Sequence, residues 1–174
     1  MKISENGLVL DSCVLINLLC SNYLKSFFEI YEDVVLAEFV LNKEIFPINE
    51  KYSYEESALE GRILKPNEEE AELILDLINE IDDGEAYSIS LALSRGYDFG
   101  SDDKKAIRVY QSYPEHKKLW TTPEIVLNFL ENSELPIDKK QVLQSIQEKG
   151  KFSPNSNHPY HYEWNKILKE GYIE

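Results

Sequence analysis

Residues 8–19, which read LVLDSCVLINLL, decide the fold. Three consecutive apolar residues, Leu8–Leu10, predict a short strand buried on both faces, as in a parallel sheet. Apolar residues then return at helical spacing, which predicts a helix that buries Leu15, Leu18 and Leu19. The stretch therefore indicates a strand that runs directly into a helix, as in α/β folds.

An aspartate stands where this strand and helix join. Asp11 follows the strand at once, and we expect Ser12 to cap the helix, since serine is a preferred N-cap residue. Open parallel sheets bind their ligands at the carboxyl ends of the strands. Asp11 is therefore a candidate ligand or catalytic group at that edge of the sheet.

Length and composition favour one domain with a real core. The chain has 174 residues, of which 43% are hydrophobic and 11% aromatic. No apolar run reaches the length of a membrane span, and the start MKISENG lacks the apolar core of a signal peptide. Cys13 and Cys20, both within one predicted helix, are too far apart to pair. These features predict a cytoplasmic protein with free thiols and no membrane segment.

The net charge of −14 disfavours broad electrostatic binding to nucleic acid. Three interpretations remain compatible with it: an acidic soluble protein, a protein with a basic partner, or carboxylates gathered around a metal ion. The charge alone does not choose among them.

Further short apolar segments alternate with helical patterns along the chain. Additional strands are predicted at Val34–Leu36, Arg62–Lys65, Tyr97–Ser101 and Leu119–Thr121. The alternation predicts an α/β fold with a mostly parallel sheet of four or five strands. We expect this domain to occupy residues 1–150. Residues 151–174 are expected to form a linker and a C-terminal helical extension, with its helix near 159–172, packed on the domain.

Capping residues predict where several helices begin. A helix is expected over Phe39–Phe46, and Asn67 with Glu70 resembles a capping box. A later helix is expected to start near Glu85, and Thr122 is expected to cap the helix that follows it in the chain.

Acidic residues recur where strands end and helices begin, at Asp11, Glu44, Glu85, Asp102 and Asp103. In a parallel sheet these positions converge on one edge, so the side chains are expected to share a pocket. Crowded carboxylates repel each other, and a divalent cation removes that conflict. Ligation by oxygen alone favours Mg²⁺ or Mn²⁺.

Each acid also has a simpler interpretation. Asp11 can be merely the cap of its helix, although Ser12 can also serve as that cap. Glu44 can be a solvated helix residue, with Glu38 as the alternative second acid. Glu85 can serve only the dipole of its helix, and either Asp102 or Asp103 can be an N-cap.

Four stretches, in this order and spacing, resemble a PIN domain: VLDSCVLINLL, EFVLNKEI, DDGEAYSISLAL and GSDDKKAI. The family pattern has an acid after the first strand and another on the helix after the second. It continues with an acid in a Gly-Glu-Ala context and with a Ser/Thr-x-Asp motif. The matching residues are Asp11, Glu44, Glu85 and Asp103. The resemblance spans residues 7–130 and implies a three-layer α/β/α sandwich.

The resemblance also implies a function, that of a metal-dependent ribonuclease acting on single-stranded RNA. Many family members are toxins of toxin–antitoxin pairs, so a small antitoxin is an implied partner, and homodimers are common in the family. Mg²⁺ or Mn²⁺ would be held by the four matching acids, with Asp102 as an auxiliary ligand. Ser101 and Ser12 would support the ligands, and the RNA backbone would contact Lys104, Lys105 and Arg108, unless these three form only a solvated helix face.

Rival folds that begin with a strand and an aspartate differ at position 13. Haloacid-dehalogenase-like phosphatases need a second aspartate there, and metal-dependent adhesion sites need a serine. Cys13 excludes both. The alternative that stays open is a PIN fold without nuclease activity that acts as a binding or regulatory module.

Overall fold

The computed structural model describes residues 1–48, 59 and 61–169. Its centre is one parallel sheet with the strand order β3-β2-β1-β4-β5. The strands are β1 (Leu8–Leu10), β2 (Val34–Ala37), β3 (Ile63–Leu64), β4 (Asp98–Gly100) and β5 (Leu119–Trp120). The predicted α/β fold with a parallel sheet is confirmed, and the sheet has five strands.

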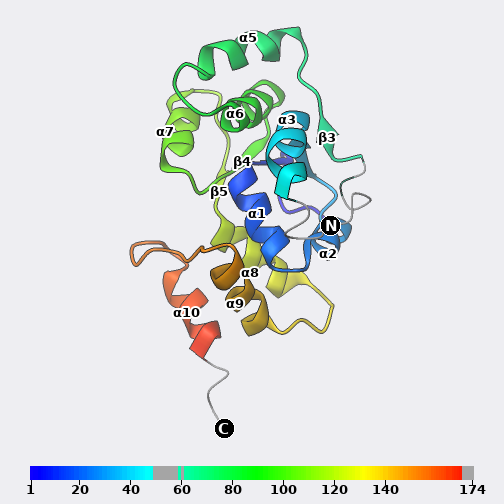
Figure 1. Cartoon of the computed structure of the whole chain (residues 1–174), viewed down its shortest axis with the longest axis vertical. Helices are drawn as coiled ribbons and strands as arrows, with labels where there is room; N and C mark the ends of the chain where they lie inside the picture. Colours follow the sequence, from blue (N-terminus) through cyan, green and yellow to red (C-terminus); the bar gives the residue numbers. More distant parts are fainter. Residues whose placement is uncertain (49–58, 60, 170–174) are drawn as a thin grey trace.

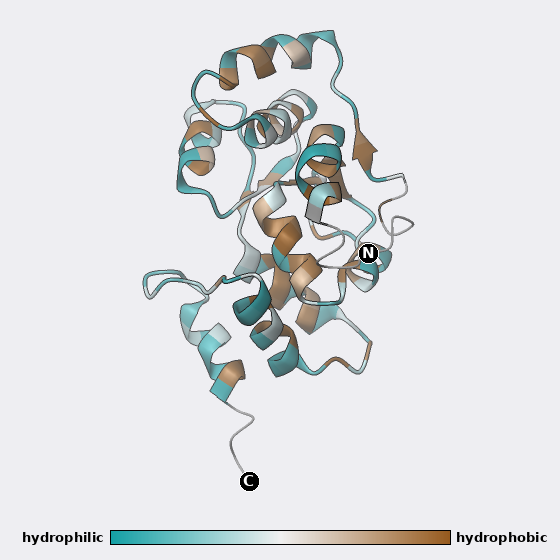
Figure 2. Cartoon of the chain, in the orientation of Figure 1, coloured by the Kyte–Doolittle hydropathy of each residue, from teal (hydrophilic) through white to brown (hydrophobic). Residues whose placement is uncertain are grey.

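Helices cover both faces of the sheet and give a three-layer α/β/α sandwich (Figure 1). One layer holds α5 (Glu68–Leu77), α6 (Asp83–Arg95) and α7 (Lys104–Ser112), and α6 contacts β1, β2 and β4. The opposite layer holds α1 (Ser12–Cys20), α2 (Leu24–Ile30), α8 (Thr122–Asn132) and α9 (Lys139–Lys149). Figure 2 shows that α1 is hydrophobic over most of its length, as a helix enclosed by the sheet, α8 and α9 must be.

The central strand is confirmed as fully buried, since Leu8, Val9 and Leu10 expose none of their surface. Leu10 lies between Leu36 and Gly100 in the sheet. A Cβ atom on Gly100 would lie 2.8 Å from Leu10 Cδ2, which explains the glycine inside a strand.

Asp98 is a buried carboxylate at the start of β4 and is 3% exposed. It accepts hydrogen bonds from Ser4 Oγ (2.7 Å), Asn6 Nδ2 (3.0 Å), Trp120 Nε1 (2.8 Å) and the Lys118 backbone N–H (3.2 Å). The charge is compensated by these donors. Asp98 therefore fastens the N-terminal segment and β5 to the sheet.

Two predicted helix caps are wrong by one residue. Asp11, in extended conformation, is the N-cap of α1, and its side chain accepts from the Ser12 backbone N–H. Thr121 is the N-cap position of α8, so Thr122 is the first helical residue. In both pairs either residue type can cap, and the backbone leaving the strand decides which one does.

Two further helices differ from expectation at their boundaries. α6 begins at Asp83, with Asp82 as its N-cap and Glu85 closing a capping box. The helix expected at 39–46 consists of α3 (Glu38–Val40), the π-helical η1 (Leu41–Ile45) and the 3₁₀-helical η2 (Phe46–Ile48). The predicted capping box of Asn67 and Glu70 is confirmed at the start of α5.

The C-terminal helix α10 (His161–Lys169) contacts α8 and α9. Its Trp164 is completely buried and packs edge-on against Phe152 at 6.1 Å. The last residues of the helix expected at 159–172 lie outside the described part of the chain. Within the described residues no single helix has the length and apolarity to cross a membrane; one pair, α1 with α2, meets the test together but is bent by 113°.

Candidate active site

Asp11 lies at the carboxyl end of the central strand and is 2% exposed. Its Oδ1 accepts from the Ser12 backbone N–H at 2.7 Å. Its Oδ2 accepts from Ser101 Oγ at 2.9 Å and from Cys13 Sγ at 3.3 Å. Burial raises the pKa of Asp11, and the charge of Asp103 raises it further against the effect of these hydrogen bonds.

Ser101 and Cys13 join the ends of β1 and β4. The Asp103 backbone N–H donates to Ser101 Oγ at 3.1 Å, and the Asp102 backbone N–H donates to Cys13 Sγ at 3.3 Å. The two side chains therefore hold Asp11 and the turn after β4 in one arrangement. Burial, then the charges of Asp11 and Asp102, raise the pKa of Cys13, which keeps the thiol protonated.

Asp103 is the N-cap of α7 and is exposed. Its Oδ1 accepts from the backbone N–H groups of Lys105 (2.7 Å) and Ala106 (2.9 Å). Within the described chain no donor bonds its Oδ2, so one oxygen of a fixed carboxylate stays available.

Glu44 comes from the π-helical turn η1 and lies against the first turn of α6. A Cβ atom on Gly84 would overlap Glu44 Oε1 and stand 2.6 Å from its Cδ. The Ser12 side chain hydrogen-bonds the Glu44 carboxylate. Burial raises the pKa of Glu44, and the charge of Asp11 adds to the effect. Glu38, the alternative second acid, instead pairs with Lys65 at 3.0 Å.

Glu85 stands at the start of α6, where its Oε2 accepts from the Asp82 backbone N–H at 3.3 Å. Burial, then the charges of Asp11 and Asp103, raise the pKa of Glu85 to about 7. The charges of two other carboxylates can raise the pKa of Glu85 only if they lie near it. The structure thus brings Glu85 and Asp103 to Asp11 from two different helices.

Asp11 interacts electrostatically with Glu44, Glu85 and Asp103, yet the four acids are not a preassembled metal site. Across residues 1–48, 59 and 61–169, no three His, Cys, Asp or Glu side chains form a group that could hold an ion as they lie. The donor set still fits a hard divalent cation, because the available ligands are carboxylate oxygens. The space beside Gly84 accommodates the Glu44 carboxylate, and a cation would relieve the repulsion between the acids.

The Asp102 carboxylate is hydrogen-bonded to Thr122 and not to the other acids. Its Oδ1 accepts from the Thr122 backbone N–H at 3.0 Å and its Oδ2 from Thr122 Oγ1 at 2.5 Å. Asn17 Nδ2 lies 3.1 Å from Thr122 Oγ1 and 3.5 Å from Asp102 Oδ2. Burial raises the pKa of Asp102, and the bonds from Thr122 oppose that change. Asp102 therefore links the end of β4 to the start of α8.

Sequence reasoning missed the parts of Cys13, Asn17, Thr122 and Gly84 in this arrangement. The sequence indicates Cys13 as a free thiol and as an obstacle to rival folds, and Thr122 as a cap. The available signals are the proximity of Cys13 to Asp11 in the sequence and the glycine directly before Glu85, at the start of a predicted helix.

The three basic residues that follow Asp103 lie on the surface of α7. Lys104, Lys105 and Arg108 are exposed, and Arg108 Nε donates to the Lys104 carbonyl at 3.1 Å. Their position beside Asp103 is compatible both with a solvated helix face and with contact to a phosphate backbone.

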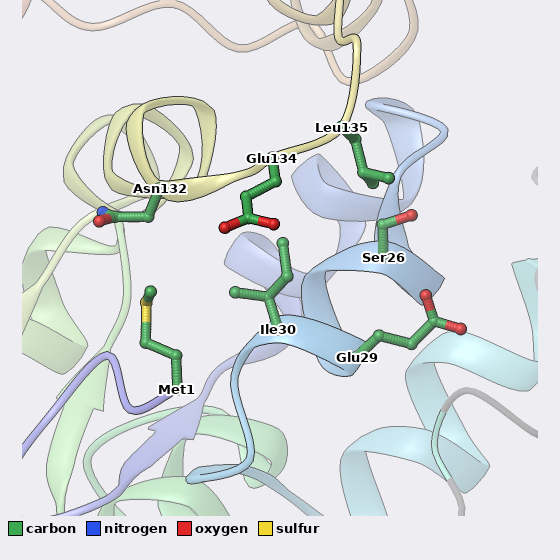
Figure 3. Close-up of a pocket in the computed structure, with 7 residues that line it drawn as sticks. All are labelled: Met1, Ser26, Glu29, Ile30, Asn132, Glu134 and Leu135. Atoms are coloured by element: carbon green, nitrogen blue, oxygen red, sulfur yellow. The ribbon is translucent and has the colours of Figure 1, made fainter.

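A cavity of about 350 Å³ lies outside the candidate active site (Figure 3). It is lined by Met1, Ser26, Glu29, Ile30, Asn132, Glu134 and Leu135. Because α2 ends just before β2 begins, this cavity lies toward the amino end of the sheet. None of the candidate site residues lines it.

The fold is a parallel α/β/α sandwich that carries acidic residues at the carboxyl edge of its sheet. A family model described as a PIN domain matches residues 7–158, and the chain belongs to the PIN-domain family. PIN domains are generally metal-dependent nucleases. No curated protein and no solved structure matches the chain significantly.

Proposed function

We propose that the protein is a divalent-metal-dependent endoribonuclease that cleaves single-stranded RNA. The observation that carries the proposal is the gathering of acids around Asp11 at the carboxyl edge of the sheet, where the charge of Asp11 acts on Glu44 and Glu85 and the charge of Asp103 acts on Asp11 and Glu85. The raised pKa values of Asp11, Glu44 and Glu85 show that their charged forms are unfavourable in the metal-free protein, and a bound cation would remove that cost. Membership of the PIN-domain family supports the same reaction class.

In this proposal Asp11, Glu44, Glu85 and Asp103 hold Mg²⁺ or Mn²⁺, with Asp102 as an auxiliary ligand at most. The bound cation would lower the pKa of a water molecule and neutralise charge on the scissile phosphate. Ser101 and Cys13 keep the Asp11 carboxylate oriented, as partners of metal ligands commonly do.

The RNA would approach over the exposed start of α7. Lys104, Lys105 and Arg108 offer positive charge beside Asp103, which would hold the phosphate backbone near the acids although the whole chain is acidic. Single-stranded RNA is the preferred substrate class, because its backbone and unstacked bases can enter a site at a sheet edge.

The test is incubation of a mixed RNA pool with Mg²⁺ or Mn²⁺, followed by sequencing of the cleavage ends. Wild type is compared with Asp103→Asn and with Glu148→Gln, which changes an exposed acid on α9 far along the chain. The proposal expects new ends with wild type and Glu148→Gln and none with Asp103→Asn. Equal patterns from all three proteins would refute it.

A second candidate function is a PIN-fold binding or regulatory module without nuclease activity. The observation in its favour is that no ready-made group of three metal ligands exists among the described residues. Titration with Mn²⁺ discriminates the two functions, because only the nuclease requires binding that depends on Asp11.

We also propose, on the basis of the family resemblance, that the nuclease is a cytoplasmic toxin with an antitoxin partner. The net charge of −14 supports a basic partner segment that reaches the carboxylates. Expression in a bacterial host tests this: growth arrest by wild type and normal growth with Asp11→Asn would support the toxin role. Normal growth with an active wild-type nuclease would contradict it.

A further inference from the structure

We propose that Gly84 is a positioning residue that places the Glu44 carboxylate beside Asp11 for a divalent cation. The inference rests on the proposed metal-dependent function for its consequence, although the geometry stands without it. It assigns a role to a glycine that is not itself a candidate ligand.

Gly84 is the second residue of α6 and is buried. Glycine is unfavourable inside a helix because it loses more backbone freedom on folding than alanine does. The residue has no left-handed backbone conformation to justify it, unlike Gly96 at the other end of α6 (φ 66°). A local folding requirement therefore does not explain this glycine.

The close approach of Glu44 does explain it. A Cβ atom at position 84 would occupy the place of Glu44 Oε1 and stand 2.6 Å from Cδ and 3.1 Å from Oε2. The whole carboxylate therefore rests on the backbone of α6 in space that only glycine leaves open. Any side chain at this position must displace the Glu44 carboxylate.

A contact from α1 and the conformation of η1 fix the same carboxylate. The Ser12 side chain at the start of α1 hydrogen-bonds it, and η1 carries it in a π-helical turn. Such turns shift side chains out of the regular helical register and are frequent at functional sites. The positive end of the α6 dipole also favours a carboxylate at this position. Glu44 is thus held where α1, η1 and α6 meet.

The Glu44 carboxylate is the far end of a flexible side chain. A Cβ atom at position 84 therefore displaces this carboxylate more easily than it disrupts helix α6. Gly84→Ala is therefore expected to fold and to lose the placement of Glu44 alone. Asp11 should keep its hydrogen bond from Ser101, because that bond involves neither Gly84 nor Glu44.

The first arm of the test is structural and requires no metal. Crystal structures of metal-free wild type and Gly84→Ala are compared at Glu44, Ser12 and Asp11. The proposal expects Glu44 to leave the α6 backbone in the variant while the Ser101–Asp11 hydrogen bond persists. A Glu44 carboxylate that stays in place in Gly84→Ala would overturn the proposal, whether or not the protein is a nuclease.

The second arm is a double-mutant cycle on Mn²⁺ affinity, measured by calorimetry. Gly84→Ala should weaken binding by about tenfold in wild type, and by less than about twofold in the Glu44→Ala background, where the space is already empty. An equal loss in both backgrounds would show that Gly84 acts through the fold and not through Glu44. If wild type itself binds no Mn²⁺, the proposed nuclease fails, while the first arm still decides the positioning of Glu44.

Discussion

Ser101 Oγ donates a 2.9 Å hydrogen bond to Asp11 Oδ2 across 90 positions of the sequence. The bond joins the carboxyl ends of β1 and β4 and leaves Asp11 buried with its charge partly compensated. Because the Asp103 backbone N–H also donates to Ser101 Oγ, one hydroxyl orients two of the candidate ligands. Substitution of each residue in this hydrogen-bond network therefore tests how the acids are positioned.

Ser101→Ala should destabilise the protein by about 1–3 kcal/mol, because it removes one donor to the buried Asp11 carboxylate and leaves the Asp103 backbone N–H without its acceptor. Cleavage of RNA should fall by about 10–100-fold, as is usual when a group that orients a metal ligand is removed. Urea unfolding and single-turnover cleavage measure the two effects. Ser94→Ala, an exposed position on α6, is the control and should change neither.

Glu85 predicts how the stability of the metal-free protein depends on pH. Its pKa rises from the ordinary 4.5 to about 7 on folding, so the folded state binds the proton more tightly than the unfolded state. Stability should therefore fall as the pH rises from about 4.5 to 7 and then level off. Thermal unfolding across this range measures the slope, and Glu85→Gln should reduce it. An unchanged slope in the variant would contradict the assignment.

Asp102 and Asp103 should respond differently to replacement by asparagine. Asp102→Asn puts an amide against Thr122 Oγ1 and Asn17 Nδ2, and should cost about 1–2 kcal/mol of stability. Asp103→Asn should change stability less and abolish Mn²⁺ binding. Denaturant unfolding with calorimetry separates the two outcomes, and the reverse pattern would make Asp102 the ligand.

Cys13 should be slow to alkylate in the folded protein. Burial and two neighbouring carboxylates raise its pKa, so little thiolate is present near neutral pH. Peptide mass spectrometry after iodoacetamide treatment should show Cys13 labelled at least about tenfold more slowly in the native than in the urea-unfolded protein. Rapid labelling of native Cys13 would show that its contacts with Asp11 and Asp102 are not maintained.

Much of the fold was predictable from local patterns. The apolar run Leu8–Leu10 specified the central strand, and the alternation of short apolar segments with helical ones specified the parallel sheet. The caps of α1 and α8 were misplaced because adjacent residues, Asp11 with Ser12 and Thr121 with Thr122, are both capping types. Only the direction of the chain leaving each strand distinguishes them.

The details of the candidate site depended on contacts that sequence spacing does not reveal. The partner of Asp102 is Thr122, 20 positions away on another helix, and the π-helical turn that carries Glu44 has no clear sequence signal. The family pattern could name Glu85 through its Gly-Glu-Ala context. That the glycine of this motif accommodates Glu44 required the three-dimensional structure.

The most direct test of the central claim is a calorimetric titration of the metal-free protein with Mn²⁺, wild type beside Asp11→Asn. The proposal predicts binding below about millimolar concentration in wild type and a loss of at least about tenfold in affinity in the variant, since the charge of Asp11 acts on Glu44, Glu85 and Asp102. Wild-type protein that binds no Mn²⁺ at millimolar concentration, or a variant that binds as tightly as wild type, would contradict a metal site at this edge of the sheet.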